Sequence, residues 1–357
     1  MLYQTKNPHG GDIYAGDITL DFSANTNPYG TPEGVRQAIR DCLCRLDRYP
    51  DPYCRQLTAA IAAFEGVRPE YILCGNGAAE LIRSWCAAVR PRLALELAPT
   101  FSEYSLALTQ AGCRVERYNL CRENLFDPQP DLVDRVERLR PDAVFLCHPN
   151  NPTGRLLPAA VLEPLLEVCR RQGTRLFVDE CFLDLTGCPD RLKDRLAENP
   201  NLFLLKAFTK SYGMAGVRLG YGLSADSDLL AAMARCSQPW NVSTPAQAAG
   251  AAAVQETEFL SRTLSLLDRQ RPALRRGLEQ LGLWVCPGAA NYLLFSGPEG
   301  LDTALRREGI GLRSCANFAA LGPGWYRTAV RLEHENKQLL AALQRLAERS
   351  KQWPAAL

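Results

Sequence analysis

The chain has 357 residues and carries 41 basic and 39 acidic side chains, which gives a formal net charge of +2 at pH 7. This length favours one large and one smaller domain, and without a long run of like charge we expect no nucleic acid as a partner. The amino-terminal segment lacks the apolar core of a signal peptide, and no stretch approaches the roughly 20 apolar residues that span a bilayer. We therefore expect a cytoplasmic protein that does not bind a membrane.

The 14 cysteines are scattered through apolar runs and lack the paired spacing of a metal site. In a reducing cytoplasm we interpret them as small buried hydrophobic residues rather than as disulfide partners. We expect no metal centre.

Between residues 71 and about 223, short apolar runs alternate with amphipathic stretches. This pattern predicts βα units around a mostly parallel sheet that is covered by helices on both faces. Helices are expected at ELIRSWCAAV, from Glu80, and at LEPLLEVCRRQG, which ends at Gly173 as a C-cap. The expected strands are 92–97, 142–147, 175–180, 201–208 and 218–223.

The remaining third of the chain has a different pattern. A long helix over 256–281 is followed by the short β runs NYLLF and GIGLRS, then by YRTAVRL and a last helix near 335–349. This order is typical of a separate α+β domain. The sequence therefore predicts an α/β protein with a loop-rich N-terminal arm (1–35) that packs on the small domain and the active site, a large domain (36–255) and a small α+β domain (256–357).

A glycine-rich turn starts one of the expected helices. In ILCGNGAAELI, residues 72–82, an apolar run breaks at Gly75 and Gly77 and a helix begins at once. Free backbone N–H groups and the helix dipole meet at such a point, which suits a phosphate. An ordinary turn before a helix has the same pattern, and the spacing matches neither the P-loop nor the dinucleotide fingerprint.

Polar residues follow two of the expected strands. The turn CHPNNPTG places Asn150 and Asn151 after strand 142–147, either as part of a rigid loop or as ligand donors at the carboxyl end of a strand. Asp179 emerges directly from the apolar run Phe177-Val178. A carboxylate at the end of a buried strand needs a cationic partner.

Lys210 follows the next strand, and Arg218 lies eight residues further on. Two cations kept close together each raise the free energy of the other's charge. That arrangement suits a lysine that works as a neutral amine with a lowered pKa, and therefore as a nucleophile. A solvated surface lysine is the alternative interpretation.

These four features occur together and in βα order, as a pyridoxal phosphate (PLP) site requires. The set resembles the fold-type I aminotransferase superfamily, and within it the class I/II branch that contains the histidinol-phosphate aminotransferases, over residues 9–347. The resemblance implies a PLP-dependent enzyme and an active homodimer.

The resemblance also implies a role for each cofactor-binding residue. Lys210 would bond to the aldehyde carbon of PLP and later move a proton, Asp179 would pair with the ring nitrogen, and Asn151 would donate to the phenolic oxygen. Tyr104 would stack on the ring. The residues implied to hold the cofactor phosphate are Gly77, Ala78, Thr209, Arg218 and, from the neighbouring subunit, Tyr49.

Two positions depart from the family pattern. Ala207 stands where a serine or threonine is common, three residues before the lysine, so one phosphate hydroxyl is missing. Phe182 stands where many aminotransferases have a tyrosine. Both substitutions suggest a changed environment around the ring.

Three stretches are more similar to decarboxylating members of the family, which act on threonine O-3-phosphate, than to transaminases. They are HGG at 9–11, DFSANTNPYG at 21–30 and GLRSCANFAALGPGWYRTAVR at 311–331. The implied product is (R)-1-amino-2-propanol O-2-phosphate, the aminopropanol linker of cobalamin. Which bond breaks at Cα depends on where the anions of the substrate are held.

The resemblance implies that a small phosphorylated amino acid is held by two arginines, which suit phosphate and carboxylate equally. We interpret Cys315 as uninvolved. A histidinol-phosphate or related aminotransferase is the first alternative, and a non-catalytic binding module of the same fold is the second. The implied substrate residues are His9, Gly10, Asn25, Asn151, Arg313 and Arg331, and Asn291 is a further candidate.

Overall fold

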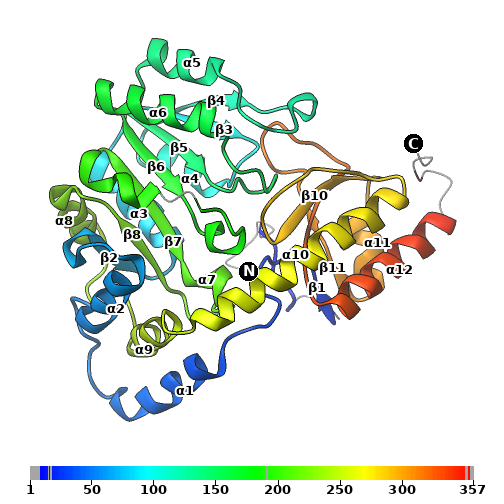
Figure 1. Cartoon of the computed structure of the whole chain (residues 1–357), viewed down its shortest axis with the longest axis horizontal. Helices are drawn as coiled ribbons and strands as arrows, with labels where there is room; N and C mark the ends of the chain where they lie inside the picture. The colour runs from blue at the N-terminus through cyan, green and yellow to red at the C-terminus, as the bar shows by residue number, and fades with distance from the viewer. Residues whose placement is uncertain (1–8, 15, 17, 190–191, 350–352, 354–357) are drawn as a thin grey trace.

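The computed structural model describes residues 9–14, 16, 18–189, 192–349 and 353. A seven-stranded sheet covered by helices forms the larger part of the molecule, and a separate four-stranded sheet forms the smaller part (Figure 1). This architecture confirms the expected fold class.

The large sheet has the strand order β2-β8-β7-β6-β5-β3-β4. The strands from β7 to β4 run parallel, whereas β8 runs antiparallel to both of its neighbours. Because β8 is reversed, its first residue, Gly220, lies beside the carboxyl ends of the neighbouring strands. The five strands expected from apolar runs are all present, and β2 and β4 complete the sheet. Their bounds are β2 (Ile72–Gly75), β3 (Leu93–Ala98), β4 (Arg114–Asn119), β5 (Ala143–Cys147), β6 (Arg175–Asp179), β7 (Leu202–Ala207) and β8 (Gly220–Leu223).

Alternate residues of the central strands enter two different hydrophobic cores. In β5, Val144 and Leu146 pack with helices α1, α2, α5, α6 and α9, while Phe145 and Cys147 pack with α3, α4 and α8. This follows from the two-residue period of a strand that is buried on both faces. The helices are α1 (Glu33–Cys42), α2 (Arg55–Glu65), α3 (Ala78–Val89), α4 (Glu103–Gln110), α5 (Asp131–Leu139), α6 (Ala159–Gln172), α7 (Phe208–Ser211), α8 (Ser227–Cys236) and α9 (Thr244–Ala253).

The smaller part is built on an antiparallel sheet with the order β12-β13-β10-β9. Helix α10 runs from the larger part along this sheet, beside α12 (Figure 1). Their bounds are β9 (Trp284–Val285), β10 (Tyr292–Ser296), β12 (Arg313–Ser314), β13 (Trp325–Ala329), α10 (Thr257–Gln280), α11 (Leu301–Arg307) and α12 (Glu333–Arg349).

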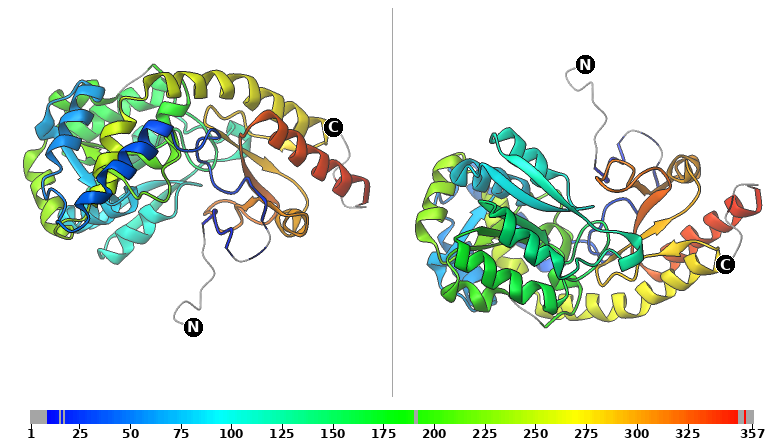
Figure 2. Two further views of the ribbon diagram at one scale, coloured as in Figure 1. Left: turned by 90° about the horizontal axis from the view of Figure 1, so that it is seen from below. Right: turned by 90° about the horizontal axis from the view of Figure 1, so that it is seen from above.

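The N-terminal segment packs on the smaller part. Strand β1 (Leu20–Asp21) pairs in parallel with β11 (Ile310–Gly311), and Phe22 is buried in the core of that part. Figure 2 shows this segment beside the smaller part in two further views. The domain bounds at residues 35 and 255 stay predictions, and residues 1–8 of the expected arm lie outside the described residues.

All 14 cysteines are free thiols, and ten of them are buried, while Cys44, Cys121 and Cys236 are exposed. Across the described ranges, none of the helices has both the length and the apolar character needed to cross a bilayer.

Substitution of Gly222 tests the packing of the large sheet. A Cβ at this position of β8 would overlap the ring of Phe203, including its Cε2 atom at 2.6 Å. Phe203 is fully buried and stacks on Phe177 at 5.1 Å between centroids, so it has no room to move. We expect Gly222→Ala to lower the free energy of unfolding by about 1–3 kcal/mol, as overpacking of a core does.

Denaturant titration measures this loss, and Gly322→Ala is the matched control. A Cβ at Gly322 would meet no atom within 4 Å, so its effect should stay within about 0.5 kcal/mol. Equal losses in the two variants would contradict the packing argument.

Candidate active site

A cavity of about 240 Å³ lies at the carboxyl ends of the central strands β5, β6 and β7 of the large sheet. Residues from the N-terminal segment, the larger part and the smaller part all line it. The structure brings together most of the residues singled out in the sequence. Those in the wall are His9, Gly10, Asn25, Ala78, Asn151, Asp179, Thr209, Lys210, Arg218 and Arg313.

Lys210 lies on α7, a short helical turn that follows β7 directly. Burial, the positive charge of Arg327 and, to a smaller extent, that of Arg218 lower the pKa of its amine to about 8. A fraction of the amine is therefore neutral near physiological pH, which is the state in which a lysine acts as a nucleophile.

Asp179 is the last residue of β6 and is buried. Its carboxylate accepts hydrogen bonds from the hydroxyl of Tyr104 (2.6 Å) and the backbone N–H of Cys181 (2.9 Å). Burial nevertheless raises the pKa of Asp179 above its ordinary value. The hydrogen bonds therefore offset only part of the free-energy cost of burying the carboxylate, and a cationic group in the cavity would stabilise it further.

One end of the cavity is suited to an anion. Ala78 begins α3, and the preceding Gly77 has φ +81°. A Cβ on Gly77 would lie 2.5 Å from Nη2 of Arg218, so the guanidinium sits directly against the start of the helix. Arg218 also has a positive φ of +61°. Both the helix dipole and a cation thus favour negative charge at this point.

Two arginines of the smaller part also line the cavity. Arg313 of β12 and Arg327 of β13 are directly paired across the antiparallel ladder, so their side chains share one face. Burial and, to a lesser extent, the charge of Arg327 lower the pKa of Arg313 to about 10, and burial lowers the pKa of Arg327. Two like charges at opposed positions repel each other, and an anion between them removes the repulsion.

Several polar atoms beside these arginines have no hydrogen-bond partner among the described residues. They are Nε of Arg327 and both side-chain polar atoms of Asn25. The other nitrogens of Arg327 donate to Asn151 Oδ1 and to the carbonyl of Ser23. Because buried polar groups are nearly always paired, these atoms are available to a polar ligand or to water.

The structure does not place Arg331 in the cavity wall, and this corrects the sequence-based expectation. Its guanidinium donates to Glu335 Oε1 (2.6 Å) and to the carbonyl of Asp21 (3.1 Å). Arg327, which was not expected from the sequence, lies in the wall instead. Asn291 also lies outside the wall and donates to the carbonyl of Asn25 (3.0 Å).

Tyr104 differs from the expectation too. The side chain is 0% exposed, so neither face of its ring reaches the cavity. Its hydroxyl donates to Asp179, which keeps the ring in this buried position. Phe101 lines the wall instead and packs edge-on against Tyr104 at 5.6 Å. The two departures noted in the sequence, Ala207 and Phe182, both lie in the wall.

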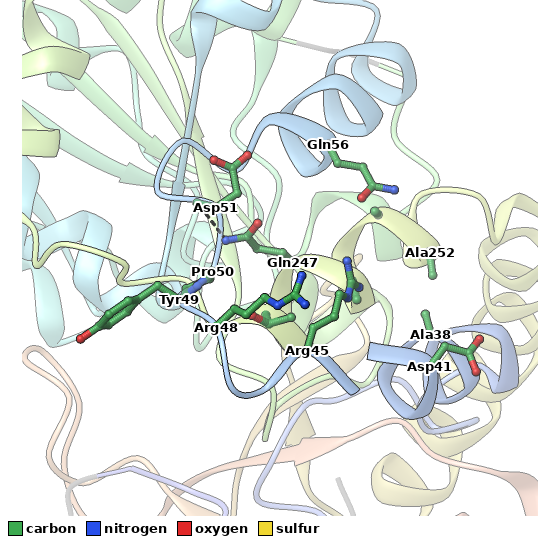
Figure 3. A pocket seen from close by; sticks show the side chains of 13 residues that line it. Ala38, Asp41, Arg45, Arg48, Tyr49, Pro50, Asp51, Gln56, Gln247 and Ala252 are labelled. Atoms are coloured by element: carbon green, nitrogen blue, oxygen red, sulfur yellow. Dashed lines mark hydrogen bonds between the residues drawn. The ribbon is translucent and has the colours of Figure 1, made fainter. Parts of the chain in front are cut away.

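Tyr49 does not reach the cavity of its own chain. It is 79% exposed and stacks on Trp240 with 4.5 Å between the ring centroids. It lies beside a separate cavity of about 570 Å³, which Arg45 and Arg48 also line (Figure 3).

Comparisons with known proteins agree with this geometry. The family model of aminotransferase class I and II matches residues 17–346. The chain is 37% identical to the threonine-phosphate decarboxylase of Salmonella typhimurium over 94% of this chain and 95% of that relative. It is 34% identical to the histidinol-phosphate aminotransferase of an Anaeromyxobacter species, over 93% and 92% of the two chains.

A solved structure has the same architecture. The histidinol-phosphate aminotransferase from Clostridium acetobutylicum aligns with a TM-score of 0.87 and 26% identity, over 93% of this chain and 100% of that one. A family match across most of the chain and relatives above 30% identity decide the assignment. The chain belongs to the class I and II aminotransferase family, has fold type I and is an enzyme that uses pyridoxal 5'-phosphate.

Proposed function

We propose that this enzyme decarboxylates L-threonine O-3-phosphate to (R)-1-amino-2-propanol O-2-phosphate and CO2, as a step of cobalamin biosynthesis. The observation that carries the proposal is the opposed pair Arg313 and Arg327 in the cavity wall. A phosphorylated amino acid brings two anions to this pair. The relative at 37% identity, named as a threonine-phosphate decarboxylase, supports the same substrate.

The residues of the cavity fit PLP. When bound, PLP withdraws electrons from the bond that breaks at the α carbon of the substrate. Asp179, whose charge is only partly offset, would hold the ring nitrogen, and Asn151 would donate to the phenolic oxygen. Phe101 would cover the ring in place of Tyr104. Gly77, Ala78, Thr209 and Arg218 would bind the phosphate of the cofactor.

Lys210 would act twice. Its amine would hold the aldehyde carbon of the cofactor, and once released it would move a proton at the α carbon of the substrate. Arg313 and Arg327 would hold the carboxylate and phosphate of the substrate, with His9, Gly10 and Asn25 beside them. Holding both anions fixes which bond at the α carbon is aligned for cleavage.

A histidinol-phosphate or related aminotransferase is the alternative, favoured by the relative at 34% identity. A non-catalytic binding module is a weaker candidate, because Asn151, Asp179, Lys210 and Arg218 are all in place. The proposal includes a homodimer in which Tyr49 of the partner subunit reaches the cofactor phosphate, as its 79% exposure allows. It also includes a cytoplasmic location, which suits 14 free thiols.

The first prediction concerns the reaction itself. Holoenzyme incubated with threonine phosphate and no keto acid should release CO2 over many turnovers without transferring the amino group. Stoichiometric formation of pyridoxamine phosphate would contradict the proposal and favour the aminotransferase.

Serine phosphate lacks the methyl group of threonine phosphate. Its kcat/KM should therefore be lower, by a factor that corresponds to about 1–3 kcal/mol.

A second prediction separates the two candidate arginines. Arg327→Met should reduce kcat/KM for threonine phosphate by about 10- to 150-fold, because it removes charge-assisted hydrogen bonds of about 1.5–3 kcal/mol. Arg331→Met should stay within about twofold, since that side chain bonds to Glu335 outside the wall. Circular dichroism of both variants controls for folding. A larger loss in Arg331→Met would restore the sequence-based assignment.

A third prediction concerns pH. The neutral amine of Lys210 is the reactive form, so the rate at which apoenzyme bonds to PLP should rise with pH through a midpoint near the pKa of about 8. Borohydride trapping followed by mass spectrometry measures the bonded fraction, and Lys210→Ala should show none. A midpoint near 10.5, the ordinary lysine value, would mean that burial and the neighbouring arginines do not act on this amine.

A further inference from the structure

We propose that Glu103 is a positioning residue for the phosphate group of the substrate, because its carboxylate holds His9 in the wall of the active cavity. This inference rests on the proposed function, since the phosphate is that of the proposed substrate. Glu103 does not line the cavity itself and acts through the histidine.

On one side, the segment that carries His9 is anchored to the smaller part. Gly10 runs so close to Ser23 that a Cβ would lie 2.8 Å from the backbone carbonyl carbon of Ser23. The backbone N–H of Gly11 donates to Oγ of Ser23 (2.8 Å), and that hydroxyl donates to Asp21 (2.6 Å). These contacts fix the backbone after His9 but leave the direction of its side chain undetermined.

Glu103 supplies the missing constraint from the larger part. Nε2 of His9 donates to Oε1 of Glu103 at 2.9 Å, and the imidazole ring also packs against Phe101 at 5.7 Å. Glu103 is the first residue of α4, one position before Tyr104. The same short stretch therefore carries Phe101, which would cover the cofactor ring, and Glu103, which sets the position of His9.

Glu103 is suited to this role by its charge. The hydrogen bond from His9, followed by the charges of His9 and Arg83, lowers the pKa of Glu103, so the side chain is a carboxylate at neutral pH. A histidine held by this carboxylate keeps one orientation in a wall that already holds several cations, where a phosphate would bind.

Phosphate positioning predicts a selective effect. In the holoenzyme, Glu103→Gln keeps the size of the side chain and removes its charge. We expect KM for threonine phosphate to rise about 3- to 10-fold, as the loss of one oriented hydrogen bond does, with kcat within about twofold. Threonine, which has no phosphate, should keep its inhibition constant against threonine phosphate.

A double-mutant cycle with His9→Ala tests whether Glu103 acts through the histidine. Glu103→Gln should add nothing to His9→Ala, because the group that it positions is already gone. Arg83→Gln is the matched control: Arg83 contacts the other oxygen of Glu103 at 3.4 Å, and its loss should change KM by less than about twofold.

Two outcomes would overturn the inference. Equal weakening of threonine phosphate and threonine in Glu103→Gln would indicate a general structural role, and additive effects of Glu103→Gln and His9→Ala would show that the two residues act independently. If Glu103→Gln does not fold, His9→Ala alone must still weaken threonine phosphate but not threonine. If the wild-type enzyme releases no CO2, the proposed function fails, and calorimetric binding of threonine phosphate to the same variants still decides the role of Glu103.

Discussion

The active cavity holds more positive than negative charge, and the rest of the site depends on that imbalance. Among the wall residues that the structure describes, Lys210, Arg218, Arg313 and Arg327 are cations and Asp179 is the one carboxylate. Like charges held close together repel one another, and counter-charges remove that repulsion. The phosphate of PLP would supply one at the start of α3, and the two anions of the proposed substrate would supply the others between Arg313 and Arg327.

Lys206 and Lys210 differ in the number of carboxylates close to their amines. Lys206 lies in β7, four residues before Lys210, and is buried, with its amine 2.9 Å from Glu65 and 3.1 Å from Asp184. Burial would lower the pKa of Lys206, and these carboxylates outweigh burial and raise it. Asp179 compensates the charge of Lys210 only in part, and the pKa of Lys210 stays lowered. One of these two neighbouring lysines is therefore a structural cation, and the other is available for chemistry.

Much of the scaffold could be predicted from the sequence because parallel strands buried on both faces are continuous apolar runs. LFLLKA and AVFLC are both central strands. Asp179 ends β6, Asn151 follows β5 and Lys210 follows β7, so all three lie where parallel strands end. Strand β4 was not predicted. Its sequence, RVERYN, is the outermost strand of the sheet and is only partly buried, so it contains few apolar residues.

The choice between the two arginines of YRTAVR could not be made from the pattern. Arg327 and Arg331 have the same parity along a strand, so both would face the cavity if the strand continued. Strand β13 ends at Ala329, and the chain turns towards α12, where Asn336 accepts the backbone N–H of Arg331. Tyr104 was misassigned for a similar reason, because the start of α4 turns its hydroxyl towards Asp179.

The most direct test of this account is a crystal structure of Lys210→Ala with PLP and threonine phosphate bound. The account predicts that the phosphate and carboxylate of the substrate contact Arg313 and Arg327, with Arg218 on the cofactor phosphate and no anion on Arg331. A substrate phosphate that points into solvent, or that is bound by Arg331, would contradict the claim that this cavity is built for a doubly anionic amino acid.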